Sequence, residues 1–221
     1  MGNKNKLKRF EDIARFENVF EYTDFGDKPT PKGKWHKEIF ENENPIVLEL
    51  ACGKAEYTIY LAEKNPDKNY IGIDLKGNRI WKGASYALQN GMNHVRFIRM
   101  LIDHLPDYFE KGEVDEIWIT FPDPHLRESR SRQRLTSPKF LNIYRKLLNP
   151  GSSIHLKTDS DLLYEFTLET IKEERCEIIK KVDDIYKEEP GNELLTHQTF
   201  YEKKHLKAGK TIHYIAFRLS E

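Results

Sequence analysis

A carboxylate held between two prolines is the first feature of this chain that could do chemistry. The apolar run Ile117–Phe121 leads directly into Pro122, Asp123 and Pro124. Proline fixes its own φ at about −65° and biases the residue before it towards extended backbone. We therefore expect Asp123 to be held stiffly at the carboxyl end of a strand, which is where parallel sheets place their active sites.

The segment that follows this carboxylate is strongly basic. Residues 126–146 contain seven basic side chains and a single acid, Glu128. The basic residues are Arg127, Arg130, Arg132, Arg134, Lys139, Arg145 and Lys146. Because cations that neutralise phosphates contribute to nucleic-acid affinity, a rigid carboxylate beside this segment suggests chemistry on nucleic acid. A basic run can also be a solvated surface, and the sequence alone leaves that alternative open.

A second group of residues is typical of a nucleoside-binding turn. The small residues of Leu50–Ala55, including Gly53, lie between a strand pattern and a helical pattern, where a ligand can approach the backbone. Asp74 ends the next strand pattern, 21 residues after Gly53, close to the spacing at which an acid reaches ribose hydroxyls. Glu49 lies inside the preceding strand, where a buried carboxylate needs a partner. Since the dinucleotide and P-loop patterns are absent from the sequence, we expect an adenosyl cofactor.

Short apolar runs alternate with helical patterns from Pro45 onward, which predicts an α/β fold with a mainly parallel sheet. Strands are expected at residues 46–50, 70–74, 94–100, 114–120, 153–157, 177–182 and 212–219. The main helices are expected at residues 57–64, 80–89, 138–148 and 162–174. The 221 residues suffice for one well-buried core. We expect residues 1–40 to form an N-terminal arm, partly flexible, beside a domain of residues 41–221.

Composition excludes several classes of protein. No apolar run approaches the roughly 20 residues that cross a bilayer, and the polar amino terminus lacks the core of a secretion signal. We therefore expect a cytoplasmic protein with no membrane partner. The 36 basic and 36 acidic side chains cancel, so the distribution of charge, not its sum, indicates nucleic acid. Cys52 and Cys176 belong to no cluster with metal-ligand spacing, so no metal is expected.

Six motifs, taken in order, resemble one known family. They are Glu49 with Gly53-Lys54, Tyr70–Asp74, Phe121–Pro124, Arg134–Thr136, His155–Asp159 and Thr199–Lys204. Over about residues 34–219 they are similar to the motifs of the bacterial tRNA (guanine-N(7)-)-methyltransferase family. The resemblance implies a Rossmann-like class I methyltransferase domain with a mostly parallel, seven-stranded sheet and helices on both faces. It also implies that S-adenosyl-L-methionine is the cofactor and that tRNA is the substrate, converted to 7-methylguanosine at variable-loop guanosine 46.

The resemblance further implies roles for single residues at the cofactor. Five residues are implied there: Glu49, Gly53, Asp74, Asp103 and Asp123. Asp123 would lie at the junction of cofactor and guanine, which makes it the catalytic candidate. Asp103 is the acid nearest to Leu101, which aligns with a family acid beside adenine. Ala51 and Ala55 depart from the family pattern, which has glycines in this turn.

Contacts to the substrate are expected from two groups of residues. The resemblance implies such contacts at Arg127, Asp159, Thr199 and Glu202. The charge of the basic segment adds phosphate contacts at Arg132 and Arg134. The chain departs from the family at His125 and Leu126, where the family has tryptophan and proline, and its basic run is diluted by polar residues.

The expected reaction needs positioning more than acid–base chemistry. N7 of guanine has a lone pair and no proton, so its methylation requires no general base. Holding the reactants in line can supply most of the rate. A carboxylate at the guanine edge would stabilise the positive charge that the purine gains, and we expect Asp123 to do this.

Other interpretations remain open at this point. A class I methyltransferase acting on a protein or a small molecule would show no dependence on tRNA. A tRNA-binding homologue with weak or lost catalysis would fit the two alanines of the cofactor turn. A nicotinamide-linked dehydrogenase shares the fold class but lacks the dinucleotide glycine pattern. The sequence is compatible with a monomer and with a homodimer.

Overall fold

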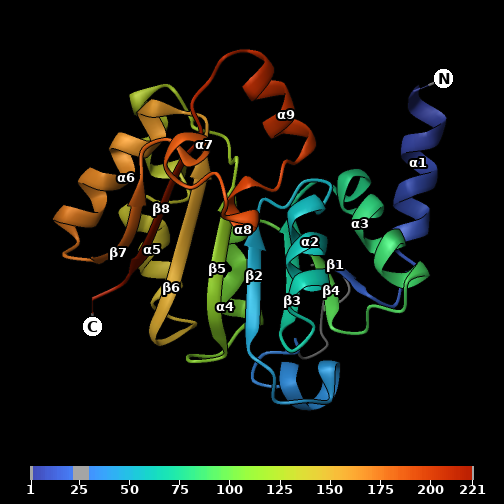
Figure 1. The fold of residues 1–221 in the computed structure, drawn as a ribbon. Helices are drawn as coiled ribbons and strands as arrows, with labels where there is room; N and C mark the ends of the chain where they lie inside the picture. The colour runs from blue at the N-terminus through green and yellow to red at the C-terminus, as the bar shows by residue number, and fades with distance from the viewer. Residues whose placement is uncertain (1, 22–29, 221) are drawn as a thin grey trace.

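The computed structural model describes residues 2–21 and 30–220. Within them, one sheet of eight strands has the order β1-β4-β3-β2-β5-β6-β8-β7 (Figure 1). The strands are β1 (Val19–Glu21), β2 (Ile46–Leu50), β3 (Asn69–Asp74), β4 (Val95–Arg99), β5 (Val114–Thr120), β6 (Leu148–Thr158), β7 (Glu177–Val182) and β8 (His213–Arg218). The helices are α1 (Gly2–Ile13), α2 (Glu56–Lys64), α3 (Gly77–Gln89), α4 (Leu105–Tyr108), α5 (Pro138–Tyr144), α6 (Asp161–Glu173), α7 (Ile185–Glu188), α8 (Glu193–Thr196) and α9 (Phe200–Lys207), with the π-helix η2 (Trp35–Phe40) and the 3₁₀-helices η3 (Ile102–His104) and η4 (Glu128–Gln133).

The sheet is parallel from β1 across to β6, and β8 then runs antiparallel between β6 and β7. The strand order reverses between β2 and β5, because β3 follows β2 on one side whereas β5 lies on the other. In parallel α/β sheets a ligand crevice forms at the carboxyl ends of the strands beside such a reversal. The topology therefore places the site at the ends of β2 and β5.

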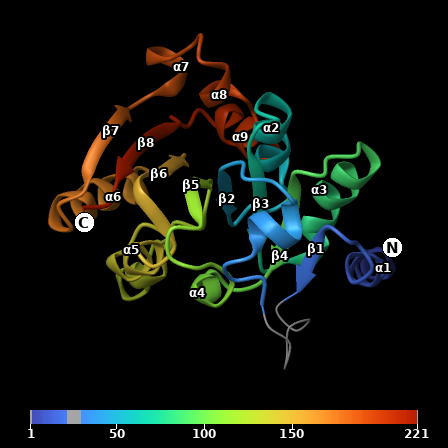
Figure 2. The same cartoon turned by 90° about the horizontal axis from the view of Figure 1, so that it is seen from below.

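Helices cover both faces of the sheet (Figure 2). One face packs under α4, α5 and α6 in a cluster that includes Trp35, Tyr108 and Phe140. The other packs under α1, α2 and α3 and the short helices α7 and α8, around Tyr57 and Ile80. A strand covered on both sides can be apolar at successive positions, and all five residues of β2 are buried. This double cover explains why the central strands read as continuous apolar runs.

The predicted fold class is confirmed, with one strand more than expected. Val19–Glu21 pairs in parallel with β4, from Phe97 to Arg99, and forms an outer edge of the sheet. Three residues are too few to show a period in the sequence. Trp35 is fully buried, so described parts of residues 1–40 pack on the sheet. The division at residue 40 stays a prediction, and residues 22–29 lie outside the described residues.

One helix ends earlier than predicted. The helix expected at residues 138–148 ends at Tyr144, and β6 already begins at Leu148, five residues before the expected strand. Leu148 is buried and pairs with Val114, which draws it into the sheet. Pro150 falls where the β5–β6 register shifts, so its missing N–H interrupts no regular ladder. Among the described helices, none is long and apolar enough to cross a membrane.

Candidate active site

Two adjoining cavities open at the carboxyl edge of the sheet. The first, called here the α9 cavity, has a volume of about 540 Å³ and lies between α9 and the ends of β2, β5 and β6. The second, called the Leu101 cavity, has a volume of about 490 Å³ and lies between α5 and the ends of β3 and β4. Ala51, Pro122 and Asp123 line both cavities. The site beside the strand reversal therefore consists of two cavities that share one wall.

The turn between β2 and α2 is held in left-handed backbone. Ala51, Gly53 and Ala55 have φ values of 57°, 57° and 58°, a region that costs a residue with a Cβ about 1–2 kcal/mol. The Asp74 carboxylate fixes this turn, because Oδ2 accepts from the Gly53 N–H at 2.9 Å and Oδ1 from the Lys76 N–H at 2.7 Å. Asp74 also lines the Leu101 cavity. The structure therefore brings the predicted glycine and acid together.

Glu49 is a buried carboxylate with hydrogen-bond donors but no cation among the described residues. Only 2% of it is exposed. It accepts from the Thr58 N–H at 2.7 Å, from the Thr58 hydroxyl and from the Thr120 hydroxyl at 2.5 Å. Burial raises the pKa of Glu49 from 4.5 to about 7, and these hydrogen bonds oppose the rise. The expectation that this carboxylate is buried with partners is confirmed, and it lines the α9 cavity.

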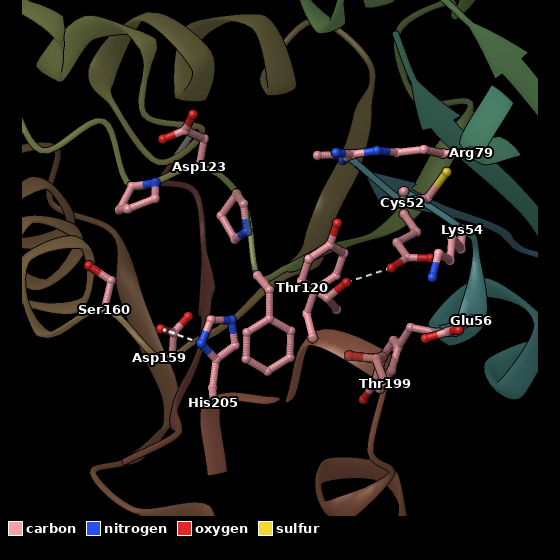
Figure 3. Close-up of a pocket in the computed structure, with 18 of the residues that line it drawn as sticks. Cys52, Lys54, Glu56, Arg79, Thr120, Asp123, Asp159, Ser160, Thr199 and His205 are labelled. Carbon is pink, nitrogen blue, oxygen red and sulfur yellow. Dashed lines mark hydrogen bonds and ion pairs between the residues drawn. The ribbon is translucent and has the colours of Figure 1, made fainter. Parts of the chain in front are cut away.

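The loop that carries Asp123 is stiff on both sides. Phe121 and His125 have positive φ values of 48° and 43°, so the Pro-Asp-Pro segment stands between two left-handed residues. The Asp123 side chain is 75% exposed, and its Oδ1 accepts from the His125 N–H at 3.0 Å. Asp123 lies across the α9 cavity from Thr199 and Glu56 (Figure 3). The carboxylate thus closes its own turn and also borders both cavities.

Arg134 supports the same loop from beneath. Only 2% of it is exposed, and its guanidinium donates to the carbonyl oxygens of Pro124 and His125, both at 3.2 Å. The guanidinium carbon lies 4.4 Å from the centre of the Phe166 ring. Arg134 was expected to bind phosphate, but this placement makes it a support for the Asp123 loop. Arg127 and Arg132 are exposed, and neither forms an ion pair with a described residue; their contacts to the substrate stay a prediction.

Asp103 lies at the rim of the Leu101 cavity. Its carboxylate forms an ion pair with Lys139, and both side chains line the cavity. Leu101 lines it too and is 48% exposed. The structure therefore places the predicted acid where an adenosine group could reach it, beside an apolar side chain at the aligned position.

Two predicted substrate residues meet at the α9 cavity. Asp159 follows β6; its carboxylate lies 3.1 Å from His205 Nδ1 and forms an ion pair with Lys210 at 2.5 Å. Thr199 caps α9, because its hydroxyl accepts from the Glu202 N–H at 3.3 Å. Asp159 and Thr199 both line the cavity.

Glu202 does not reach the cavity. It is fully buried, with carboxylate oxygens 2.8 and 2.9 Å from the Lys157 ammonium and 2.8 Å from the Tyr186 hydroxyl. Burial lowers the pKa of Lys157, and the attraction of Glu202 opposes this. Lys157 also donates to the His197 carbonyl at 3.1 Å. The substrate contact expected of Glu202 can therefore act only through α9, which this ion pair anchors.

Comparison with known sequences decides the family. A family model described as "Putative methyltransferase" matches residues 43–215. A tRNA (guanine-N(7)-)-methyltransferase of Christiangramia forsetii is 48% identical over 99% of this chain and 100% of its own length. A protein of the same name from Bacteroides thetaiotaomicron is 43% identical over 99% of this chain and 87% of its own length. The chain belongs to the tRNA (guanine-N(7)-)-methyltransferase family. The predicted family and enzyme class are confirmed.

Solved structures of methyltransferases share the fold of this family member. The 16S rRNA methyltransferase KamB covers 84% of this chain and 92% of its own, with a TM-score of 0.64 at 15% identity. A geranyl diphosphate C-methyltransferase from Streptomyces coelicolor covers 80% and 74%, with a TM-score of 0.56 at 14% identity. At such identities the likeness concerns the fold, which is the Rossmann-like class I methyltransferase fold.

The residues of the site fit S-adenosylmethionine, the methyl donor predicted for the family. In the Leu101 cavity, the apolar side chains of Met100, Leu101 and Phe140 lie near the Asp74 carboxylate. Such a combination suits an adenine ring and its ribose. From the shared residue Ala51 the site continues to Glu49, a buried acid that lacks a cation. A positively charged ligand would supply one.

Several residues of the α9 cavity had not been singled out from the sequence. They are Lys54, Glu56, Arg79, Thr120, Tyr201, His205 and Lys210. Lys54 and Tyr201 lie inside two of the family motifs, next to predicted site residues, and that proximity in sequence could have indicated them. Arg79 and Lys210 are brought in by the fold alone. Within residues 2–21 and 30–220, no cluster of three or more His, Cys, Asp or Glu side chains could hold a metal ion.

Proposed function

We propose that this protein transfers a methyl group from S-adenosylmethionine to N7 of a tRNA guanosine, at variable-loop guanosine 46. Family membership supports the reaction. The observation that carries the proposal is the position of Asp123 on the wall shared by two cavities. One cavity suits a nucleoside cofactor, and the other opens beside exposed cations. The same proposal places the enzyme in the cytoplasm, as a monomer or a homodimer.

The chain's own residues divide the work of holding the cofactor. S-adenosylmethionine, when bound, supplies an electrophilic methyl group. Asp74 and the Leu101 cavity would hold its adenosine part, and Glu49 would face its positively charged part. Asp103 would assist at the adenine side, although its ion pair with Lys139 already occupies one oxygen. Ala51 and Gly53 have small or no side chains, so a ligand can lie against the backbone of the turn.

Guanine is held and stabilised, not deprotonated. Its N7 attacks with a lone pair, so the site needs no base at that atom. Asp123 would stabilise the positive charge that the purine gains, and its Oδ2 forms no hydrogen bond to a described residue. That oxygen can accept from the N–H groups of guanine, which adenine does not match. Asp159 and Thr199 line the same α9 cavity as Asp123 and would position the nucleotide.

One assay tests this function directly. The protein is incubated with unmodified tRNA transcript and labelled S-adenosylmethionine, and the methylated nucleoside is identified by mass spectrometry. We expect 7-methylguanosine from the full transcript and none from a transcript whose variable-loop guanosine is replaced by adenosine. Label in a different nucleoside, or in a protein and not in tRNA, would overturn the proposal.

Replacing Asp123 by asparagine tests its role. We expect turnover to fall by about 100-fold, the scale for losing one preorganised electrostatic group. Stability should change by less than about 0.5 kcal/mol, because the side chain is largely exposed. Single-turnover kinetics with tRNA bound to saturation separates the chemical step from binding. Full turnover in this variant would show that Asp123 only closes its turn.

A further inference from the structure

Helix α9 begins with two aromatic side chains that the fold leaves uncovered. Phe200 is 53% exposed and Tyr201 is 39% exposed. Their rings meet edge to face, with centroids 5.5 Å apart at 81°. Tyr201 lines the α9 cavity, and the Lys54 ammonium lies 4.0 Å from the centre of the Phe200 ring. Two large exposed rings therefore stand together at the mouth of the proposed site.

The same helix carries cations that have no acidic partner. Lys203, Lys204 and Lys207 are exposed, and none forms an ion pair with a described residue. Other exposed lysines are paired, such as Lys64 with Glu193 and Lys187 with Asp184. The single acid of α9 is Glu202, which points into the protein and is neutralised by Lys157. The outer face of α9 is therefore positively charged.

This face is held in a fixed position before any ligand arrives. The Lys157–Glu202 pair anchors α9 to β6, and the Thr199 hydroxyl caps the helix. The Phe200 N–H donates to the Glu56 carboxylate at 2.6 Å, which ties the start of α9 to the start of α2. A preorganised surface loses little entropy when it binds. The exposed rings are therefore displayed on a rigid support.

We propose that α9 is a tRNA-docking element, in addition to the basic segment of residues 126–146. Phe200 and Tyr201 would stack on unpaired nucleobases beside the target guanosine, and Lys203, Lys204 and Lys207 would contact phosphates. Aromatic rings interleaved with unpaired cations are the features that bind single-stranded nucleic acid, and RNA loops offer splayed bases for stacking. The inference rests on the proposed function, because it assumes that tRNA is the substrate.

The lysines are tested by the salt dependence of tRNA binding. Affinity of the full chain for unmodified tRNA is measured over a range of salt concentrations, without cofactor. We expect the variant Lys203→Gln/Lys204→Gln/Lys207→Gln to lower the log–log slope by about two to three, at about 0.7–0.9 for each lost phosphate contact. The control is Lys37→Gln/Lys111→Gln/Lys172→Gln, three exposed lysines outside both cavities, for which the slope should stay unchanged.

The rings are tested by single substitutions. Phe200→Leu and Tyr201→Leu should each weaken tRNA binding by about five- to 150-fold at constant salt, the range for one base stacked on an aromatic ring. Tyr86→Leu, which alters an exposed tyrosine of α3 outside both cavities, is the control. For Phe200→Leu, calorimetry should show unchanged affinity for S-adenosylmethionine, and thermal unfolding should show an unchanged fold.

The outcomes separate this inference from the proposed function. If the wild type binds tRNA and forms 7-methylguanosine while the α9 variants match their controls, the docking inference is wrong and the function stands. If the wild type binds tRNA through α9 without methylating it, the docking inference stands and the function fails. If the wild type does not bind tRNA, or binds a protein through α9 instead, both are overturned.

Discussion

The protein buries two carboxylates near the α9 cavity, Glu49 in its lining and Glu202 behind α9, and only one of them is paired with a cation. Glu202 lies against the Lys157 ammonium, within 2.8 Å, and its charge is compensated inside the protein. Glu49 accepts only from neutral donors on Thr58 and Thr120, and its pKa is raised to about 7. A compensated acid can serve the architecture, whereas an uncompensated one is available to a ligand. Glu49 is therefore the acid that we propose faces the cofactor, and Glu202 anchors α9, the proposed tRNA-docking helix.

The largest effect is expected from breaking the compensated pair. Lys157→Met leaves Glu202 buried without a cation, which should lower the free energy of unfolding by about 3–5 kcal/mol. Chemical denaturation measures the change. The double variant Lys157→Met/Glu202→Met, which buries no charge, should recover most of the loss. If the single variant were as stable as the wild type, Glu202 would not depend on this pair, and the contrast with Glu49 would fail.

An intermediate effect is expected from the uncompensated acid, and it depends on pH. The folded protein holds a proton on Glu49 up to about pH 7, whereas the unfolded chain releases it near pH 4.5. The stability that the protonated Glu49 contributes to the folded protein is fully present below pH 4.5. It is lost as pH rises through about 7. Between pH 4.5 and 8 the wild type should therefore lose about 3 kcal/mol relative to Glu49→Gln.

Denaturation of both proteins across this pH range measures the difference, since all other titrating groups are shared. Calorimetry adds a second readout. Affinity for S-adenosylmethionine should rise with pH through about 7 in the wild type, because the ionised Glu49 attracts a positive ligand, and should be flat in Glu49→Gln. Parallel curves for both proteins would mean that Glu49 does not titrate in this range.

The smallest effect is expected in the turn next to Glu49. Ala51 has a left-handed backbone that glycine adopts without strain. Relief of about 1–2 kcal/mol of strain is partly offset by the greater freedom of glycine in the unfolded chain, so Ala51→Gly should raise the free energy of unfolding by about 0.5–1 kcal/mol. Ala55→Gly is the matched comparison. The Ala55 methyl is fully buried and packs against Gly83. The packing is so close that a Cβ added at Gly83 would lie 2.5 Å from the Ala55 Cβ. The lost burial should cancel the relief, leaving Ala55→Gly near zero by thermal unfolding.

Most of the fold was predictable because its strands are strongly apolar. β2, β5 and β7 begin and end at the predicted residues, since each contains a short apolar run that the sequence shows directly. β1 was missed because Val19–Glu21 is too short to show a pattern, and it is defined only by its pairing with β4. The end of α5 was misplaced because Leu148 fits either a helix or a strand, and its pairing with Val114 decides between them.

The site was predictable where it follows from the ends of strands. Carboxyl ends of parallel strands meet at one edge, so Glu49, Asp74 and Asp123 had to lie close together. The placement of Glu202 could not be inferred, because its partner Lys157 is 45 residues away in the chain. Arg134 likewise looked like one more surface cation, and only the Phe166 ring and the carbonyls of the Asp123 loop reveal its burial.

The place of β8 has a consequence for the order of assembly. β8 is the last strand in the chain but lies between β6 and β7, and among the described strands β7 pairs with β8 alone. Chains leave the ribosome amino end first, so β1 to β6 can pair before residues 213–218 are made, whereas β7 must wait for them. A nascent chain would thus complete the β6–β8–β7 edge of its sheet only at the end of synthesis.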